Sequence, residues 1–378
     1  LDRDALAQAR ELFAAKHANL DVASWNDVTL LDRARVTING NITRAALLLL
    51  GKPESASRLN PHPAEITWNL TGEERAYEHF GPPFLLATSR LFSKIRNIQV
   101  RLLPENELVA HEVAKYDQKV VLEALHNCIA HQDYSQNSRV TVTEHGDRLV
   151  FENAGSFFEG KPEDYVPGDK RPPRYRNPFL AQAMTELNMI DHMGYGIHDI
   201  YQRQRNRFFP LPDYDLQQRE MVRLTIHGKI VDPAYSRLLM QRTGLALADV
   251  LALDRVQKGL PITDEAARHL RRGKLIEGRK PKFHVSAQVA AATSTMADYV
   301  RTRAQDDEFY AKLLTDYLGG AGTASRKDVD RLLLNKLSDA LTPDQKVKKV
   351  ANLLTKLRRQ GRIINTGPRA APQWRLAE

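Results

Sequence analysis

Apolar and polar positions follow two different periods along this chain of 378 residues. Residues 118–130 place apolar side chains three or four positions apart, which predicts a helix. Residues 139–144 and 148–152 alternate with a period of two, and the turn at residues 145–147 predicts a hairpin. Because helices are interspersed with antiparallel strands up to residue 228, the pattern predicts an α+β fold. The same reasoning predicts further strands at residues 66–70, 98–103, 108–115 and 221–226, and further helices within residues 1–52 and at 83–96, 180–188 and 197–207.

A different pattern begins after residue 228, where two segments each run helix, turn, helix, turn, helix and basic strand pair. Both end their last helix with Leu-Arg-Arg, and a glycine, a basic residue and two apolar β-formers follow shortly after. A helix-turn-helix followed by such a strand pair is typical of a winged-helix domain. Residues 287–297, rich in Ala, Ser and Thr, predict a linker between the two segments. We therefore expect a mostly helical N-terminal segment packed on the core, a central α+β domain and two winged-helix domains, at residues 1–60, 61–228, 234–286 and 305–378.

Charge is distributed unevenly. The net charge is +9, but residues 268–282 alone carry a balance of +6 and residues 341–378 one of +7. Clustered Lys and Arg are the footprint of a protein that binds nucleic-acid backbones, although any single basic run can also be a solvated helix face. The basic clusters thus add DNA to the expected partners of the two winged-helix segments.

Composition restricts the compartment and excludes several classes of site. Cys128 is the one cysteine, so an internal disulfide framework and a cysteine-rich zinc site are excluded, and a reducing cytoplasm is expected. No apolar run approaches the roughly 20 residues that span a bilayer, so we expect no membrane partner. Since the first residue is Leu1 rather than Met, we expect the chain to be a segment of a longer protein.

Three polar residues form a stripe on the helix predicted at 118–130. Glu123, Asn127 and His131 are spaced four apart, so they share one face of an otherwise apolar helix. An amide oxygen can ligate Mg²⁺, and a nearby carboxylate can orient or deprotonate water. This pattern suits a Mg-nucleotide, but a solvent-facing stripe would also explain it.

Glycines elsewhere in the chain favour the nucleotide interpretation. Asn153-Ala-Gly155 follows the predicted hairpin, and Gly194-Tyr-Gly196 opens a predicted helix. Glycines before a helix start let backbone N–H groups approach a phosphate. Between the two lies a long loop with several Gly, Pro, Lys and Arg residues. We expect residues 156–174 of it to be mobile without nucleotide and to close basic side chains over phosphates.

The order of these features resembles the GHKL (Bergerat-fold) ATPases, which include gyrase, histidine kinases and mismatch-repair ATPases. It is more similar still to a bacterial and archaeal family of transcriptional regulators with a GHKL-like domain and winged helices. Residues 123–134 read Glu-Ala-Leu-His-Asn-Cys-Ile-Ala-His-Gln-Asp-Tyr, where that family has Glu-Ala-x-x-Asn-Ala-x-x-His-Arg-Asp-Tyr. Residues 147–155 resemble its Asp-Arg-x-x-x-x-Asn-Pro-Gly motif. Residues 176–178 and 194–197 resemble its Arg-Asn-Pro and Gly-Thr-Gly-Ile, and residues 41–51 resemble an early segment of it.

The resemblance implies a GHKL-like α/β sandwich that binds ATP and Mg²⁺, typically preceded by a Schlafen/AlbA-like domain. It implies Glu123 as the water-activating base and Asn127 as the Mg²⁺ ligand. Asn153 stands where GHKL proteins usually have the adenine-binding Asp, and an amide can also bond adenine. Whether ATP is hydrolysed or only bound is left open. The further nucleotide-binding positions that the resemblance implies are Gly155, Lys161, Arg176, Gly194 and Gly196.

The leading hypothesis is therefore an ATP-binding, DNA-binding transcriptional regulator. An ATPase acting in DNA transactions or defence, and a protein-interaction regulator with a vestigial nucleotide site, are the alternatives; a homo-oligomer is also open. In winged helices the third helix commonly enters the major groove and the wing touches the backbone. The residues expected to contact DNA are Arg271, Arg272, Lys346, Lys349, Lys356, Arg359, Arg369 and Arg375. The residues of the last helix expected to face the core are Val347, Val350, Leu354 and Leu357.

Overall fold

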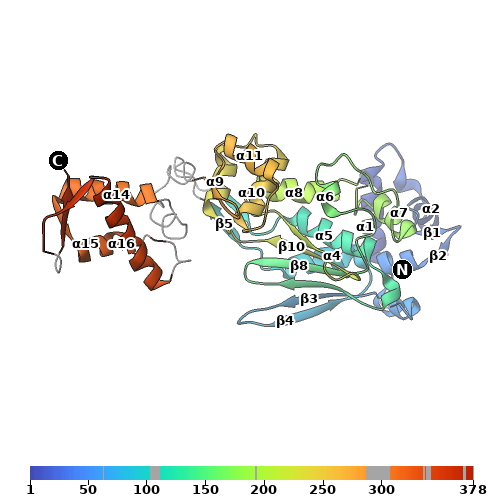
Figure 1. Ribbon diagram of the computed structural model, residues 1–378. Coiled ribbons are helices and arrows are strands. Elements are labelled where there is room, and N and C mark those ends of the chain that lie inside the picture. Colours follow the sequence, from blue (N-terminus) through green and yellow to red (C-terminus); the bar gives the residue numbers. More distant parts are fainter. Residues whose placement is uncertain are drawn as a thin grey trace. The chain divides into compact units, whose positions relative to one another are not determined.

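The computed structural model describes residues 1–62, 64–102, 111–191, 194–286, 307–334, 337, 342–368 and 372–377 (Figure 1). They fall into two compact units, Leu1–Lys258 and Gly259–Glu378, which are described separately below. The mixture of helices with a mixed sheet agrees with the predicted α+β class. No helix in the described ranges is long and apolar enough to cross a membrane.

The first unit begins with the mostly helical segment that the sequence predicted. Its helices are capped at their first turns by Asp2, Asn26 and Thr43, whose side chains accept backbone N–H groups. Asn39 and Gly40 both have positive φ and form the turn of a small hairpin. The Pro- and Ser-containing stretch that follows α3 forms a 3₁₀ helix. The elements are α1 (Arg3–Lys16), α2 (Asp27–Arg33), β1 (Thr37–Ile38), β2 (Asn41–Ile42), α3 (Arg44–Leu50) and the 3₁₀ helix Pro53–Leu59.

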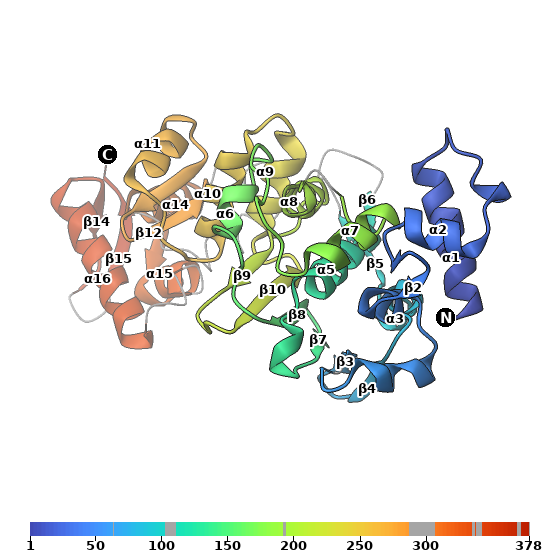
Figure 2. The same ribbon diagram turned by 90° about the vertical axis from the view of Figure 1, so that its right-hand side faces the viewer.

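A six-stranded sheet forms the centre of the unit, in the order β4-β3-β7-β8-β10-β9 (Figure 2). β3 and β7 are parallel, whereas the other neighbours are antiparallel. The sequence predicted the four inner strands, but not β4 and β9, which form the two edges. The strands are β3 (Ile66–Leu70), β4 (Ala76–Phe80), β7 (Val140–Glu144), β8 (Arg148–Ala154), β9 (Asp213–Asp215) and β10 (Met221–His227).

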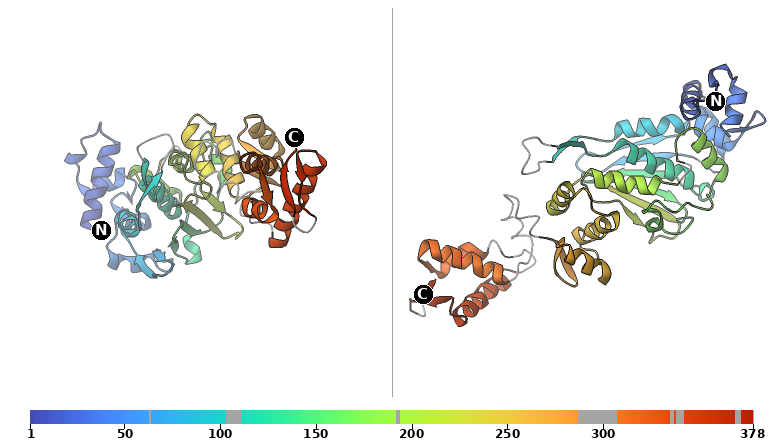
Figure 3. Two further views of the ribbon diagram at one scale, coloured as in Figure 1. Left: turned by 90° about the vertical axis from the view of Figure 1, so that its left-hand side faces the viewer. Right: turned by 90° about the horizontal axis from the view of Figure 1, so that it is seen from above.

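Helices cover one face of this sheet and give a two-layer architecture. The right panel of Figure 3 shows α4, α5 and α8 side by side above the strands. Val142, Phe151 and Ile226 point into the layer between sheet and helices and are fully buried. The opposite face is polar and includes an ion pair between Arg223 and Glu152. The helices of this layer are α4 (Phe84–Lys94), α5 (Gln118–His131), α7 (Pro178–Glu186) and α8 (Gly196–Asn206).

The remaining elements of the first unit lie outside the central sheet. β5 (Gln99–Leu102) and β6 (His111–Ala114) pair in a separate two-stranded sheet. α9 (Pro233–Gln241) and α10 (Leu247–Gln257) end the unit. The next predicted elements, α11 (Asp264–Arg272), β11 (Ile276–Arg279) and β12 (Lys282–Val285), belong to the second unit. The boundary between units thus falls inside the segment predicted as one domain, and the linker predicted at residues 287–297 lies outside the described residues.

The C-terminal part of the second unit has its own apolar core, which includes Leu314, Leu357 and Trp374. Its elements follow the order helix, strand, helix, helix, strand, strand, and the strands form a sheet in the order β13-β15-β14. On α16 the prediction of core residues was partly wrong, because Val347 is 46% exposed and Leu353 is buried in its place. The elements are α14 (Asp307–Ala321), β13 (Thr323–Ser325), α15 (Arg326–Leu333), α16 (Pro343–Arg359), β14 (Ile363–Asn365) and β15 (Gln373–Leu376).

Candidate nucleotide-binding site

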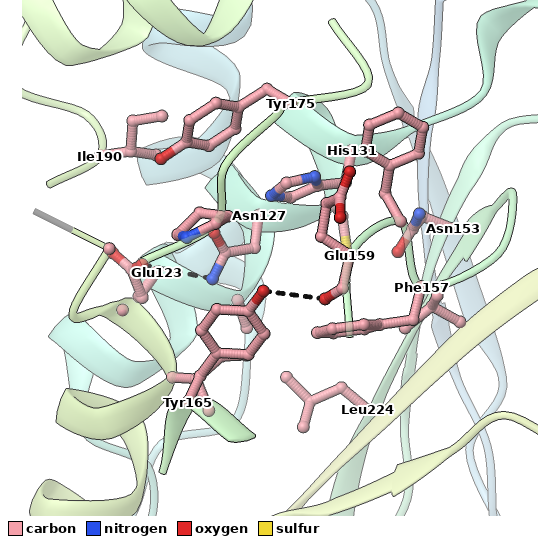
Figure 4. Close-up of a pocket in the computed structure, with 18 of the residues that line it drawn as sticks. Glu123, Asn127, His131, Asn153, Phe157, Glu159, Tyr165, Tyr175, Ile190 and Leu224 are labelled. Atoms are coloured by element: carbon pink, nitrogen blue, oxygen red, sulfur yellow. Dashed lines mark hydrogen bonds between the residues drawn. The ribbon is translucent and has the colours of Figure 1, made fainter. Parts of the chain in front are cut away.

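The stripe predicted on α5 lines a cavity between that helix, the sheet and the start of α8 (Figure 4). Glu123, Asn127 and His131 all contribute to its wall. Asn127 Nδ2 donates a hydrogen bond to Glu123 Oε1 at 3.2 Å. The amide oxygen of Asn127 makes no hydrogen bond with any residue that the structure describes. That oxygen is therefore available to ligate a cation.

The carboxyl group of Glu123 is largely buried, and burial raises its pKa to about 7. The charges of Asp199 and Asp191 raise it further, while the hydrogen bond from Asn127 acts in the opposite direction. The Glu123 carboxyl group therefore exchanges its proton close to neutral pH. A general base is most effective when its pKa lies near the working pH.

Gly196, the first residue of α8, allows Glu123 to occupy this position. A Cβ at Gly196 would lie 1.9 Å from Glu123 Oε1 and 3.4 Å from Asn127 Nδ2. Gly194 also lines the cavity and has a positive φ of 77°, which favours glycine. Gly196 thus lies directly against the Glu123–Asn127 pair, whereas a Cβ on Gly194 would meet Pro172 at 2.9 Å.

The opposite end of the cavity contains Asn153, near the end of β8 (Figure 4). Its side chain is buried, and Nδ2 donates to the Ala154 carbonyl oxygen at 3.1 Å. Gln132, which stands in place of the arginine of the resembled family, accepts a hydrogen bond from the Ala154 amide at 2.8 Å. Sequence reasoning gave Gln132 no role, but the structure shows that it fixes the strand end that carries Asn153.

The loop that follows β8 folds its aromatic side chains into the cavity. Phe157 packs edge-on against Tyr214 of β9, with ring centroids 6.1 Å apart, and also contacts Tyr165. The remaining cavity has a volume of about 110 Å³. Small-molecule sites usually offer roughly 300–1,000 Å³, so a whole nucleotide does not fit while these side chains remain inside.

Two of the four basic residues of the same loop form ion pairs within it. Lys170 Nζ lies 2.7 Å from Asp164, and Arg174 Nε lies 2.6 Å from Glu159. Lys161 is exposed at the start of the short helix α6 (Pro162–Tyr165) and does not line the cavity. Arg174 is the loop cation that reaches the cavity wall among the described residues. Counting charges in the sequence could not reveal these pairings.

Arg176 and Gly155 lie beside the cavity rather than in its wall. Arg176 Nη2 donates to the Ser156 carbonyl oxygen at 2.8 Å, and its guanidinium group lies 4.9 Å from the Phe158 ring centroid. A Cβ on Gly155 would meet this guanidinium group at 2.9 Å. The positive charge of Arg176 also contributes, after burial, to lowering the pKa of His131 to about 4. His131 is therefore neutral at physiological pH.

The residues expected to contact DNA belong to the second unit. Arg271 and Arg272 end α11; Arg271 donates to the Gly278 carbonyl oxygen, and Arg272 is exposed. On α16, Lys349 and Lys356 both approach Asp307, at 3.9 Å and 3.2 Å.

The other predicted DNA contacts differ in exposure. Lys346 is partly exposed on α16, whereas Arg359 at the end of that helix is exposed. Arg375 lies on β15 and is partly exposed. Arg369 lies outside the described residues.

No group of three or more His, Cys, Asp or Glu side chains in the described ranges could hold a metal ion by itself. Mg²⁺ is commonly bound by one or two protein oxygens together with substrate phosphates, so this donor set is compatible with it.

Comparison with known proteins supports an ATPase-like region. Residues 137–226 match the family model described as "Putative ATP-dependent DNA helicase recG C-terminal". Residues 1–65 match one described as "Domain of unknown function (DUF8451)". The match at residues 137–226 includes β7, β8, α8 and β10, while α5 with Glu123 and Asn127 precedes it. The match indicates a nucleotide-binding, ATPase-like region within the first unit.

A solved structure shows a likeness in fold. The DIP2311 protein from Corynebacterium diphtheriae is 18% identical, with a TM-score of 0.50. The likeness covers 76% of this chain and 62% of that protein, so the chain spans less than two thirds of its length. No protein in the curated set matches the chain significantly.

The pKa of Glu123 leads to a testable prediction about stability. Its ordinary value is 4.5 and its folded value is about 7, so between these pH values the folded protein retains a proton that the unfolded chain releases. The free energy of unfolding should therefore fall as pH rises through this window, by about 3 kcal/mol in total. Glu123→Gln should remove this contribution. Denaturant titrations at pH 5 and pH 8 measure it.

The comparison with wild type is needed because His126 and His131 have lowered pKa values and contribute in the opposite direction. Their contributions cancel in the difference between the two proteins. Glu11→Gln, at an exposed position of α1, is the matched control and should follow the wild type. Equal pH dependence in wild type and Glu123→Gln would contradict the assignment.

Proposed function

We propose that this chain is an ATP-binding, DNA-binding transcriptional regulator in which Mg-ATP binds in the cavity beside α5. The observation that supports it most is the Glu123–Asn127 pair, packed against Gly196 at the start of α8. The ATPase-like match of the adjoining strands and helix adds support.

Each residue of the proposed site has a defined task. Asn127 supplies an oxygen ligand to Mg²⁺, which when bound neutralises phosphate charge. The N-terminus of α8 attracts the phosphates through its backbone N–H groups. Glu123 accepts a proton from water, for which a pKa of about 7 is suitable. Asn153 meets the base at the other end of the cavity.

Nucleotide binding in this proposal requires the loop at residues 156–174 to move. Phe157 and Tyr165 fill space between the sheet and α5, and the cavity that they leave is about 110 Å³. Displacing the two rings enlarges it, and breaking the Arg174–Glu159 pair frees a cation for phosphate. Mg-ATP should therefore change the hydrogen exchange of this loop.

Asn127→Ala is expected to weaken Mg-ATP binding by about tenfold or more, because it removes a metal ligand, and one lost interaction of about 1.4 kcal/mol corresponds to a factor of ten. Glu123→Gln should keep the affinity within about threefold, since the amide retains the shape of the side chain. Isothermal titration calorimetry measures both. Asn206→Ala, an exposed asparagine at the end of α8, is the control. If the unmutated protein gives no heat with millimolar Mg-ATP, the site is vestigial and protein interaction becomes the better interpretation.

An ATPase acting in DNA transactions is the second candidate, and the near-neutral pKa of Glu123 favours it. Measured phosphate release separates the two candidates. The enzyme would be favoured if Glu123→Gln abolishes phosphate release but retains ATP binding.

The proposed DNA binding rests on the basic surface of α16 and on the order of helices and strands in the C-terminal part of the second unit. The C-terminal order of elements, helix, strand, helix, helix, strand and strand, supports the proposed winged helix. Lys348 and Arg359 are exposed on α16, opposite the buried Val350 and Leu357. Lys349 and Lys356 share the carboxylate of Asp307, which offsets part of their charge.

Lys348→Ala/Arg359→Ala should therefore weaken binding to duplex DNA and reduce the salt slope by about two. The Lys346/Lys349/Lys356 triple alanine variant should reduce it by less than about three, since Asp307 already offsets two of these charges. Fluorescence anisotropy at a series of salt concentrations measures both variants.

Lys52→Ala/Lys312→Ala is the matched control for the DNA experiment. It removes two exposed charges outside α16 and should leave the slope unchanged. If the α16 variants stay folded and retain the wild-type affinity and slope, the basic helix is a solvated surface and the DNA proposal is wrong.

A further inference from the structure

A second cavity lies between the first 65 residues and the start of α7. Its volume is about 350 Å³, within the range of small-molecule sites. It shares no lining residue with the nucleotide cavity among the described residues. Its walls are largely apolar, and α3 and α7, which supply much of them, are in contact. The apolar lining includes Ala45, Leu48, Leu59, Phe179 and Leu180.

The cavity is lined by basic side chains. Arg44, Arg176 and His62 line it, and no carboxylate does among the described residues. Arg44 is exposed and makes no hydrogen bond or ion pair with any residue that the structure describes. It is also the first residue of α3, where a cation gains nothing from the helix dipole. Arg176 Nε is buried without a partner. Arg176 also pairs with Asp133 at 3.7 Å and bonds to Ser156, so its Nε atom and the guanidinium group of Arg44 are the donors left for a ligand.

Backbone donors add to the positive character of the cavity. Pro178, Phe179 and Leu180 form the first turn of α7 and line it. The preceding Asn177 does not cap the helix, because its Nδ2 donates to the carbonyl oxygens of Ala130 and Gln132. The amides of Phe179 and Leu180 thus have no acceptor within the helix. Uncapped amides at a helix start favour an anion.

We propose that this cavity binds a small amphipathic anion, in which a carboxylate or phosphate group is carried on an apolar body about the size of an aromatic ring. The apolar walls of α3 and α7 bury the body. Arg44, Arg176 and the first turn of α7 receive the acidic group. The site does not depend on nucleotide or DNA binding, so it goes beyond the function proposed above.

Arg176 links this cavity to the loop over the nucleotide site. It lines the second cavity, while its Nη2 bonds to Ser156 and its guanidinium group stacks on Phe158. Ser156 and Phe158 both line the nucleotide cavity. An anion that binds Arg176 competes with these contacts, so occupation of the second cavity loosens the start of the loop.

The binding test uses the full chain and three probes of similar size: benzoate, phenyl phosphate and the neutral benzamide. Calorimetry or ligand-observed NMR should give saturable binding of the two anions with a Kd of about 1 mM. Benzamide should bind at least about tenfold more weakly, because charge-assisted hydrogen bonds to Arg are lost.

Arg44→Gln should weaken binding of the anions by about tenfold as well. Arg58→Gln, at an exposed position outside the cavity, is the control and should bind as the wild type does. Lack of saturation by either anion, or equal affinity in Arg44→Gln, would overturn the site.

The link to the loop is tested by hydrogen exchange without any nucleotide present. Saturating phenyl phosphate should raise exchange of the amides at residues 156–158 by about threefold or more in the wild type, and leave it unchanged in Arg176→Gln. Unchanged exchange in the saturated wild type would overturn the link. Since no nucleotide is used, failure here is distinct from failure of the proposed ATP site.

Discussion

Gly196→Ala is expected to lose most of the Mg-ATP affinity of the protein, by about tenfold or more, and to lower the free energy of unfolding by about 1–3 kcal/mol. The added Cβ would lie 1.9 Å from Glu123 Oε1, so the carboxylate must leave its position and its hydrogen bond to Asn127. The start of α8 would then no longer fit against α5. Calorimetry and denaturant unfolding measure the two effects.

Gly146→Ala is the matched control for this experiment. Gly146 has no atom within 4 Å of the position of an added Cβ, and it does not have a positive φ. The control should therefore bind and unfold as the wild type does. A Gly196→Ala variant with unchanged affinity would show that the Glu123–Asn127 pair is not part of the nucleotide site.

Leu357→Ala is expected to destabilise the C-terminal part of the second unit by about 2–5 kcal/mol, the cost of a cavity left by a buried leucine. Leu357 is fully buried in a core that includes Leu314 and Trp374. The free energy of unfolding of a small domain is only a few kcal/mol, so much of this C-terminal part should be unfolded at 37 °C in the variant. Differential scanning calorimetry of the full chain should show its transition at a much lower temperature.

Val347→Ala on the same helix provides the control, because Val347 is 46% exposed. Its substitution should change the free energy of unfolding by less than about 0.5 kcal/mol. Equal destabilisation by the two substitutions would mean that the apolar face of α16 is incorrectly assigned.

Periodicity predicted the elements that position the candidate site. The four-residue spacing of Glu123, Asn127 and His131 does place them on one wall of a cavity, because α5 is regular and its other faces are apolar. Edge strands β4 and β9 were missed for a physical reason. An edge strand has one neighbour and is partly solvated, so it needs no clear alternation; Tyr77 of β4, for example, is 72% exposed.

The side-chain contacts of the loop at residues 156–174 could not be predicted from the sequence. Its lysines and arginines can be counted, but their partners depend on folding, as in the Arg174–Glu159 pair. The packing of Phe157 against Tyr214 also joins residues that are far apart in sequence. An aromatic cluster at residues 157, 158 and 165 was a signal that this loop has an apolar side.

The parallel pairing of β3 with β7 has a consequence for synthesis on the ribosome. β4 ends at Phe80 and β7 ends at Glu144, so 64 residues are added between completion of the β3–β4 hairpin and completion of β7. At about 5–20 residues per second, the hairpin waits roughly 3–13 s for the strand that completes its inner side. Ile66 and Trp68 have no sheet partner on that side during this time. The nascent chain therefore exposes an unpaired, apolar strand edge for several seconds. During this time a chaperone that binds apolar segments would protect the hairpin most from aggregation.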